Sequence, residues 1–240
     1  MRTAVLVSGG GLNLQAILDA HTFGELPGCE LAAVISSDPG AYALRRAAMA
    51  GVEHFVVERE LFPNHMSFCN AMRAKLRDID AELVVLAGYA YPLDMTFYRY
   101  FPNRIIAVWP SLLPAFPPAE MGDEITLQKT VLARGVRVTG ATSFFMTDRP
   151  GEGPIILQKP VGVLPGDDAG TLAQRILTQA EQPLLVHALP GNNVGDHRLA
   201  LGEGTRLIQH HGVDAVEGLQ GLGGFDKDAV FRSLPGAHHN

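Results

Sequence analysis

The stretch Thr3–Gly11, TAVLVSGGG, decides the fold class of this chain of 240 residues. It begins with a short apolar run containing two valines, which is typical of a buried strand. Three glycines, Gly9 to Gly11, follow the run, and the next segment, LNLQAILDA, has apolar residues at helical spacing. A strand, a glycine turn and a helix in this order form the first unit of an α/β sheet.

The first half of the chain repeats this alternation of strand and helix. Further apolar runs cover residues 30–37, 54–58, 81–90 and 104–109, and segments with helical periodicity separate the earlier runs. The run over residues 81–90 is continuously apolar, as expected at the centre of a parallel sheet. These features predict an α/β fold with a Rossmann-like, doubly wound and mostly parallel sheet.

The pattern changes after residue 118. We expect a helix over residues 125–135, and an antiparallel hairpin whose strands lie within residues 136–148 and 154–168. A long helix is predicted over residues 168–189, with a candidate bend at Pro183. From there glycine becomes dense and the pattern weakens, which predicts a variable and partly flexible tail over residues 191–240.

Composition narrows the class of protein. The apolar content of 47% is enough for a substantial core, and the net charge of −6 argues against a nucleic-acid-binding protein. Cys29 and Cys69 have neither metal-ligand nor redox-pair spacing, so we expect no disulfide framework and no metal site. No run is long enough to span a membrane. We therefore predict a cytoplasmic protein, either a monomer or a homodimer, with no membrane partner.

The glycine turn is a candidate phosphate site. Glycines let the backbone approach an anion closely, and a helix N-terminus supplies free N–H groups with partial positive charge. A phosphate would lie over Gly11, Leu12 and Asn13. The pattern is not the full dinucleotide motif, because it lacks the last glycine. The alternative is that the glycines only make a tight turn between strand and helix.

Several stretches in chain order resemble the phosphoribosylglycinamide formyltransferase family. They include VLVSGGGLNLQAILDA from Val5, ELVVLAGY from Glu82, NRIIAVWPSLLPAF from Asn103 and GPIILQKPV from Gly153. The resemblance runs from residue 1 to about residue 190. It implies one formyltransferase-like domain over residues 1–190.

The resemblance also implies a division of labour and a reaction. Residues 1–104 would hold the substrate phosphate at Gly11, Leu12 and Asn13, and residues 105–190 would carry the catalytic and folate half. The family transfers a formyl group from 10-formyltetrahydrofolate to a phosphorylated amine such as glycinamide ribonucleotide. A folate pocket would then include the positions His65, Ala90, Tyr91, Pro92, Leu93 and Ala107.

This chain departs from the family's residue pattern at the catalytic positions. An asparagine, a histidine and an aspartate of the family fall on Ala107, Trp109 and Gly151, and a further histidine falls on Phe144. Asparagine and a cationic histidine would stabilise the oxyanion, and the aspartate would hold the histidine. A shift of register cannot restore the histidine, because none lies between His65 and His187.

The altered positions leave alternatives open. Trp109 either fills the vacated pocket or offers a stacking platform for a flat ligand. Glu152 is the candidate substitute carboxylate beside the pocket. The acidic residues Glu120, Asp123 and Glu124 form either a solvated loop or a replacement acid or hard-metal site. Glu181 falls near the carboxylate with which the family binds the substrate's amine side, or is a surface residue.

Two functions follow. The chain is either a divergent formyltransferase whose standard catalysis is lost or altered, or a non-catalytic homologue that binds a phosphorylated metabolite or a partner protein. Removal of a cooperating catalytic set leaves little beyond positioning of the reactants. We therefore expect ordinary formyl transfer by this chain to be very slow or absent.

Overall fold

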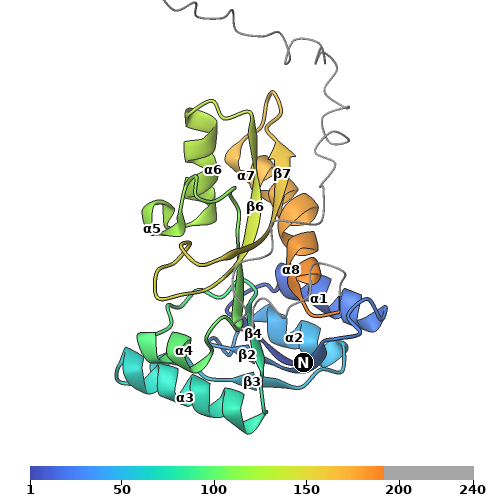
Figure 1. The fold of residues 1–240 in the computed structure, drawn as a ribbon, viewed down its shortest axis with the longest axis vertical. Coiled ribbons are helices and arrows are strands. Elements are labelled where there is room, and N and C mark those ends of the chain that lie inside the picture. The colour runs from blue at the N-terminus through green and yellow to red at the C-terminus, as the bar shows by residue number, and fades with distance from the viewer. Residues whose placement is uncertain (192–240) are drawn as a thin grey trace, which may run out of the picture. The chain divides into compact units, whose positions relative to one another are not determined.

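The structure is a computed structural model that describes residues 1–191; the tail predicted beyond them lies outside this range. Seven strands form one sheet in the order β3-β2-β1-β4-β5-β6-β7 (Figure 1). Strands β1 to β5 are parallel, whereas β6 pairs antiparallel with both β5 and β7. The predicted parallel sheet and the C-terminal hairpin are thus confirmed. The strands are β1 Arg2–Val7, β2 Glu30–Ser36, β3 His54–Val56, β4 Leu83–Leu86, β5 Ile105–Trp109, β6 Val138–Phe145 and β7 Ile155–Gly162.

The helices connect the strands as the periodicity predicts, with three short additions. The elements η1, α4 and α5 were not expected, because three, six and four residues are too few to show a helical period. Asp94 starts α4 by accepting a hydrogen bond from the Phe97 amide. The helices are α1 Leu12–Thr22, α2 Tyr42–Met49, η1 Arg59–Leu61, α3 His65–Asp78, α4 Met95–Tyr100, α5 Pro118–Met121, α6 Glu124–Ala133, α7 Ala169–Ile176, η2 Leu177–Glu181 and α8 Gln182–Ala188.

The predicted long helix is present as α7, η2 and α8 in direct succession. Its irregular part is a π-helical turn, Leu177–Glu181, which ends two residues before Pro183, where a bend was predicted. Proline has no N–H with which to continue the helical hydrogen bonds, and single π turns are frequent at functional sites. The π-helical turn ends at Glu181, whose side chain is buried.

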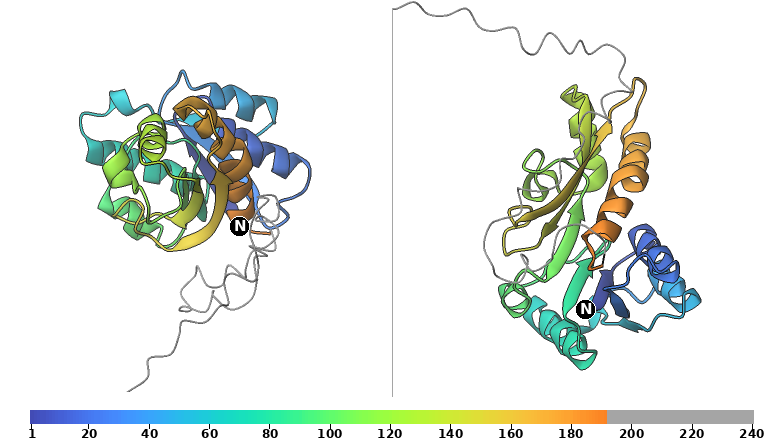
Figure 2. Two further views of the ribbon diagram at one scale, coloured as in Figure 1. Left: turned by 90° about the horizontal axis from the view of Figure 1, so that it is seen from above. Right: turned by 45° about the vertical axis from the view of Figure 1, so that its right-hand side comes forward.

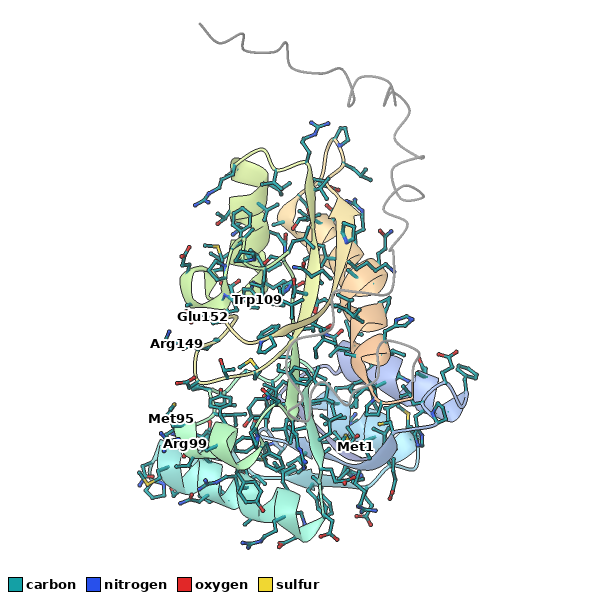
Figure 3. All side chains as sticks on the ribbon, in the orientation of Figure 1. Met1, Met95, Arg99, Trp109, Arg149 and Glu152 are labelled. Carbon is teal, nitrogen blue, oxygen red and sulfur yellow. The ribbon has the colours of Figure 1, made fainter. Side chains whose placement is uncertain are left out.

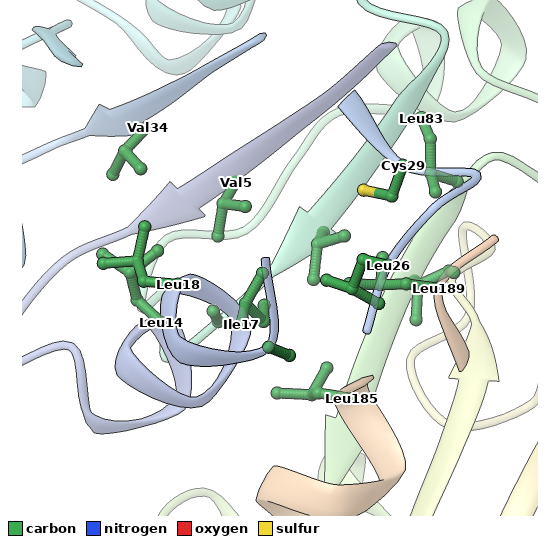
Figure 4. Packing of buried hydrophobic residues seen from close by; sticks show 14 of the residues in the cluster. Val5, Leu14, Ile17, Leu18, Leu26, Cys29, Val34, Leu83, Leu185 and Leu189 are labelled. Atoms are coloured by element: carbon green, nitrogen blue, oxygen red, sulfur yellow. The ribbon is translucent and has the colours of Figure 1, made fainter. Parts of the chain in front are cut away.

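Alternate residues of the parallel strands face two separate cores. Val5 and Val7 pack beneath α1 and α8, whereas Ala4 and Leu6 pack against α3 and α4. Figure 2 shows these helices on opposite faces of the sheet. Figure 4 shows Leu14, Ile17 and Leu185 in the same cluster as Val5. Both faces of the parallel strands are therefore covered, as their continuous apolar sequences require.

A third core lies between the hairpin and the last helices. Leu127 and Val131 of α6, Ala141 of β6, Val161 of β7 and Leu172 of α7 are all buried in it. Trp109, at the end of β5, packs against the edge of this cluster. Within residues 1–191, no helix has the length and apolar character needed to cross a bilayer.

Candidate functional site

The glycine turn joins β1 to α1 in a conformation that requires glycine at one position. Gly11 has φ +72°, and a Cβ there would lie 2.7 Å from the Cβ of Ala43. Gly11 is the N-cap of α1, and no side chain caps this helix. The first-turn amides of Leu12 and Asn13 are therefore not occupied by a capping group, as an anion site requires.

Arg46 of α2 reaches the same turn. Its Nε donates to the Gly10 carbonyl at 2.8 Å, and one terminal nitrogen donates to Oε1 of Gln15 at 2.9 Å. The guanidinium also lies 5.0 Å from the ring centroid of Tyr42. This cation places positive charge beside the candidate phosphate site. Sequence reasoning missed it, because nothing in the local pattern links residues 36 positions apart.

Ser8 ties the glycine turn to the loop after β4. Its backbone N–H donates to the Gly88 carbonyl, and its hydroxyl accepts from the Ala90 amide at 3.0 Å. Parallel strands β1 and β4 are neighbours, so their carboxyl ends meet here. The predicted phosphate turn and the start of the predicted folate loop are therefore adjacent.

The remaining folate-pocket candidates gather in two neighbouring clusters. Leu93 is buried, and the Tyr91 ring packs on Phe68 and Tyr89. His65 opens α3 and lies 3.6 Å from the sulfur of Cys69 in the same region. Ala107 belongs to the second cluster, and Leu86 and Met146 pack against both. Of these candidates, Pro92 has no distinguishing contact.

Trp109 is held at the end of β5 by the loop that follows it. Its indole Nε1 donates to the Phe116 carbonyl at 2.8 Å, and the Ser111 hydroxyl donates to the Ala115 carbonyl at 2.7 Å. Thr142 of β6 donates to the Ser111 carbonyl and accepts from the Leu113 amide. The loop is therefore fixed to the hairpin, and the indole N–H is already used within the protein.

The three positions to which the resemblance assigns the family's catalytic residues lie close together. Ala107 and Phe144 are buried with Leu113, and Trp109 packs against this group. A Cβ on Gly151 would lie 3.8 Å from Leu113 and 2.6 Å from the Cδ of Pro118. These positions thus converge on one place, where Ala107, Phe144 and Gly151 have no polar side chain and the indole N–H of Trp109 is bonded to Phe116.

Glu152, the candidate substitute carboxylate, is exposed. It lies in the loop between β6 and β7 and pairs with Arg149 at 3.3 Å (Figure 3). Both side chains are more than half exposed, at 64% for Glu152 and 75% for Arg149. Such a pair interacts weakly in water. Glu152 therefore lacks the burial that would prepare a carboxylate for acid–base chemistry.

Glu181 is the buried carboxyl group of the site. Its Oε2 accepts a hydrogen bond from the side-chain amide of Asn13 at 3.1 Å. Its Oε1 and the Oδ1 of Asn13 are both buried without a hydrogen-bond partner. The residue is only 5% exposed, so the alternative that Glu181 is a surface residue is wrong. The π turn that carries Glu181 could not be read from helical periodicity.

The pKa of Glu181 is raised from 4.5 to about 7, mainly because the carboxyl group is buried; the nearby Glu124 carboxyl also raises it, and the bond from Asn13 lowers it. Glu124 begins α6, and its own pKa is raised, first by burial of its carboxyl group and then by Asp123, although the residue as a whole is exposed. Glu124, the first residue of α6, is therefore near enough to Glu181 to act on it electrostatically.

The other residues considered for chemistry have structural roles. Asp123 caps α6 by accepting from the Thr126 amide. Cys29 and Cys69 are free, buried thiols, and burial raises the pKa of each. Among the described residues, no group of three or more His, Cys, Asp or Glu side chains could hold a metal ion.

Comparison with known proteins places this arrangement in a family. Residues 1–189 match the model of the formyl transferase family. The chain belongs to that family. Its relatives include the phosphoribosylglycinamide formyltransferase of Escherichia coli strain K12, with 31% identity over 210 residues, which are 86% of this chain and 96% of that protein.

Two further matches are to a much longer protein and to a solved structure. A trifunctional purine biosynthetic protein adenosine-3 from Drosophila pseudoobscura pseudoobscura is 37% identical over 176 residues, which are 73% of this chain but only 12% of that protein. The crystal structure of glycinamide ribonucleotide transformylase 1 from Symbiobacterium toebii matches with a TM-score of 0.73 and 41% identity. That match covers 79% of this chain and 85% of the other.

Proposed function

We propose that the chain binds a phosphorylated primary amine of the glycinamide ribonucleotide type, and that its standard formyl transfer is much slower than that of its relatives. The observation that carries the proposal is the contrast between two parts of one site. The amine-binding part has the polar groups it needs, whereas the strand end that should stabilise the oxyanion is apolar.

The amine-binding part supports a ligand with two charged ends. A phosphate fits the uncapped N-terminus of α1 at Gly11, with the Arg46 guanidinium beside it. An amine fits the orphaned oxygens of Glu181 and Asn13, because buried acceptors without a partner are costly and an N–H donor would satisfy them. Asn13 takes part in both, because its backbone lies in the candidate phosphate turn and its side-chain amide donates to Glu181.

The strand end supports the loss of rate. The oxyanion that forms when an amine attacks a formyl group needs hydrogen-bond donors aimed at it, and each donor is worth roughly 10²–10³ in rate. Ala107 and Gly151 have no polar side chain, and the N–H of Trp109 is bonded to Phe116. Binding and positioning alone would remain.

A folate donor remains compatible with the neighbouring clusters. The Tyr89 hydroxyl is buried without a hydrogen-bond partner beside the ring of Tyr91. A flat ligand with polar edges, such as 10-formyltetrahydrofolate, would offer that partner and supply the formyl group. His65, Tyr91 and Leu93 would line its binding site. The second candidate function, a non-catalytic binding protein, is favoured by the apolar filling around Ala107.

The test compares binding with turnover on the same purified protein. We expect glycinamide ribonucleotide to raise the melting temperature, because a ligand that binds only the folded state at 100 times its Kd stabilises it by about 2.7 kcal/mol. Turnover with 10-formyltetrahydrofolate should lie at least about 100-fold below that of the Escherichia coli relative, as loss of oxyanion donors implies.

Matched glycine variants control the binding arm. Gly11→Ala should abolish the ligand-induced shift, because its Cβ would meet Ala43 and its φ is positive. Gly9→Ala should keep the shift, since a Cβ at Gly9 meets nothing within 4 Å. Turnover within tenfold of the relative would contradict the proposed rate loss, and absence of any shift with wild type would contradict the proposed ligand.

A further inference from the structure

Gln128 of α6 is a fully buried polar side chain that has no part in the site described above. Leu127 and Val131 of the same helix are buried in the third core. The Gln128 Nε2 donates to the Pro110 carbonyl at 3.0 Å, whereas its Oε1 is buried without a hydrogen-bond partner. Only the amide nitrogen can donate to a carbonyl, so this contact fixes the orientation of the amide.

Stability does not explain why an amide is buried here. An enclosed amide oxygen without a partner costs free energy, and an apolar side chain of similar length would avoid that cost. Departures of this kind are expected where a residue serves a functional site. The one bond that Gln128 does make therefore indicates its role.

That bond holds the residue that follows Trp109. Pro110 has no N–H, so its carbonyl is the only backbone group through which a hydrogen bond can hold it. Gln128 takes this carbonyl at the start of the loop after β5, and the Trp109 indole donates to the Phe116 carbonyl at the other end. The segment lies at the carboxyl end of a parallel strand, where α/β proteins bind their ligands.

We propose that Gln128 is a positioning residue, which holds Trp109 and Pro110 so that the indole ring forms a fixed wall of the binding site for a flat ligand. This inference rests on the proposed function. Gln128 acts through Pro110 and is not itself in contact with the ligand.

The surroundings of Trp109 fit this role. The side chain is half-buried and packs against the cluster of Ala107, Leu113 and Phe144. Its N–H is already bonded within the protein, so the ring offers its apolar surface, which suits an aromatic ring system such as a pterin. A wall that is fixed before binding need not be ordered by the ligand, and affinity rises accordingly.

The first test uses Trp109 as its own reporter, because it is the only tryptophan of the chain. Gln128→Met removes the donor and keeps the length of the side chain. Its tryptophan emission should move to longer wavelength and be quenched more by iodide, with the far-UV circular dichroism unchanged. Thr130→Val is the matched control on α6, because the Thr130 hydroxyl donates to the Thr126 carbonyl of the same helix. Its emission should equal that of wild type.

A second variant keeps the test decisive if Gln128→Met folds poorly. In Gln128→Glu, a protonated carboxyl group can donate to the Pro110 carbonyl, whereas a carboxylate cannot. Burial favours the protonated form, so this variant should have wild-type emission at low pH and shifted emission once the group ionises. Wild type at each pH is the reference. Wild-type emission in both variants at every pH would overturn the positioning role.

Binding then connects the wall to the ligand. Calorimetry with 10-formyltetrahydrofolate should give an affinity about twofold to tenfold lower for Gln128→Met than for wild type, as expected when one more side chain must be ordered on binding. Inorganic phosphate, which needs only the glycine turn, should bind both proteins alike. Equal affinities for 10-formyltetrahydrofolate would overturn the inference. Failure of wild type to bind either 10-formyltetrahydrofolate or glycinamide ribonucleotide would overturn the proposed function, whatever the emission shows.

Discussion

At the scale of single residues, burial decides which carboxyl group of the site can do chemistry. Glu152 lies in the loop between β6 and β7 and faces water beside Arg149. Glu181 is enclosed and keeps one oxygen without a partner. The exposed group interacts mainly with solvent, and the enclosed one is available to a ligand.

The buried carboxyl group should make stability depend on pH. Because the pKa of Glu181 is higher in the folded state, the folded protein binds more protons, and its stability falls as pH rises from about 4.5 to about 7. Glu181→Gln removes this loss. The free energy of unfolding of Glu181→Gln, minus that of wild type, should rise by up to about 3 kcal/mol as pH rises through this range. Urea unfolding at a series of pH values checks this expectation.

The difference between the two proteins cancels other titrating groups, and Glu120→Gln serves as a control for the loss of one surface charge. Parallel pH profiles for wild type and Glu181→Gln would show that the carboxyl group is not perturbed by folding.

At the scale of elements, much of the fold could be predicted and part of the site could not. Strands such as Leu83–Leu86 follow from continuous apolar runs, and helices such as His65–Asp78 follow from helically spaced apolar residues. The site depends on contacts between distant segments. The bond from Arg46 to Gly10 and that from Asn13 to Glu181 have no local signature.

The contact between α2 and the glycine turn carries a prediction of its own. Arg46→Ala should weaken binding of a phosphorylated amine by about tenfold, since a hydrogen bond to a charged group is worth about 1.5–3 kcal/mol and 1.4 kcal/mol is tenfold. Arg45→Ala is the matched control. Arg45 is the neighbouring arginine of α2, and its guanidinium also lies over the Tyr42 ring, 5.9 Å from the ring centroid. Calorimetric titration of both variants measures the effect, and equal affinities would refute a role for Arg46.

At the scale of the whole molecule, the chain keeps the sheet order of the family's fold. The sheet order, the loop after β5 and the hairpin still bring Ala107, Trp109 and Gly151 together. The resemblance predicted from sequence alone that these positions belong to one site. It could not reveal that Pro118 lies against Gly151, because the loop that carries Pro118 departs from the family pattern.

Restoring polar groups should therefore recover part of the reaction. The double variant Ala107→Asn, Trp109→His should raise formyl transfer at least about tenfold over wild type, a conservative fraction of what oxyanion donors supply. Adding Gly151→Asp should give no further gain, because its Cβ would lie 2.6 Å from Pro118 at φ +83°.

Adding Pro118→Gly to that triple variant removes the obstructing ring. The rate of formyl transfer should then rise above that of the double variant. Single-turnover assays on the four proteins, each with its melting temperature, distinguish lost chemistry from lost folding. A triple variant that outperforms the double would show that Pro118 does not obstruct this position.

The packing of Pro118 against Gly151 also bears on how such a protein could change over time. A lineage that gained an aspartate at residue 151 first would meet a steric clash with Pro118. The loop that carries Pro118 would have to change earlier. One proline ring therefore makes the order of these mutations matter.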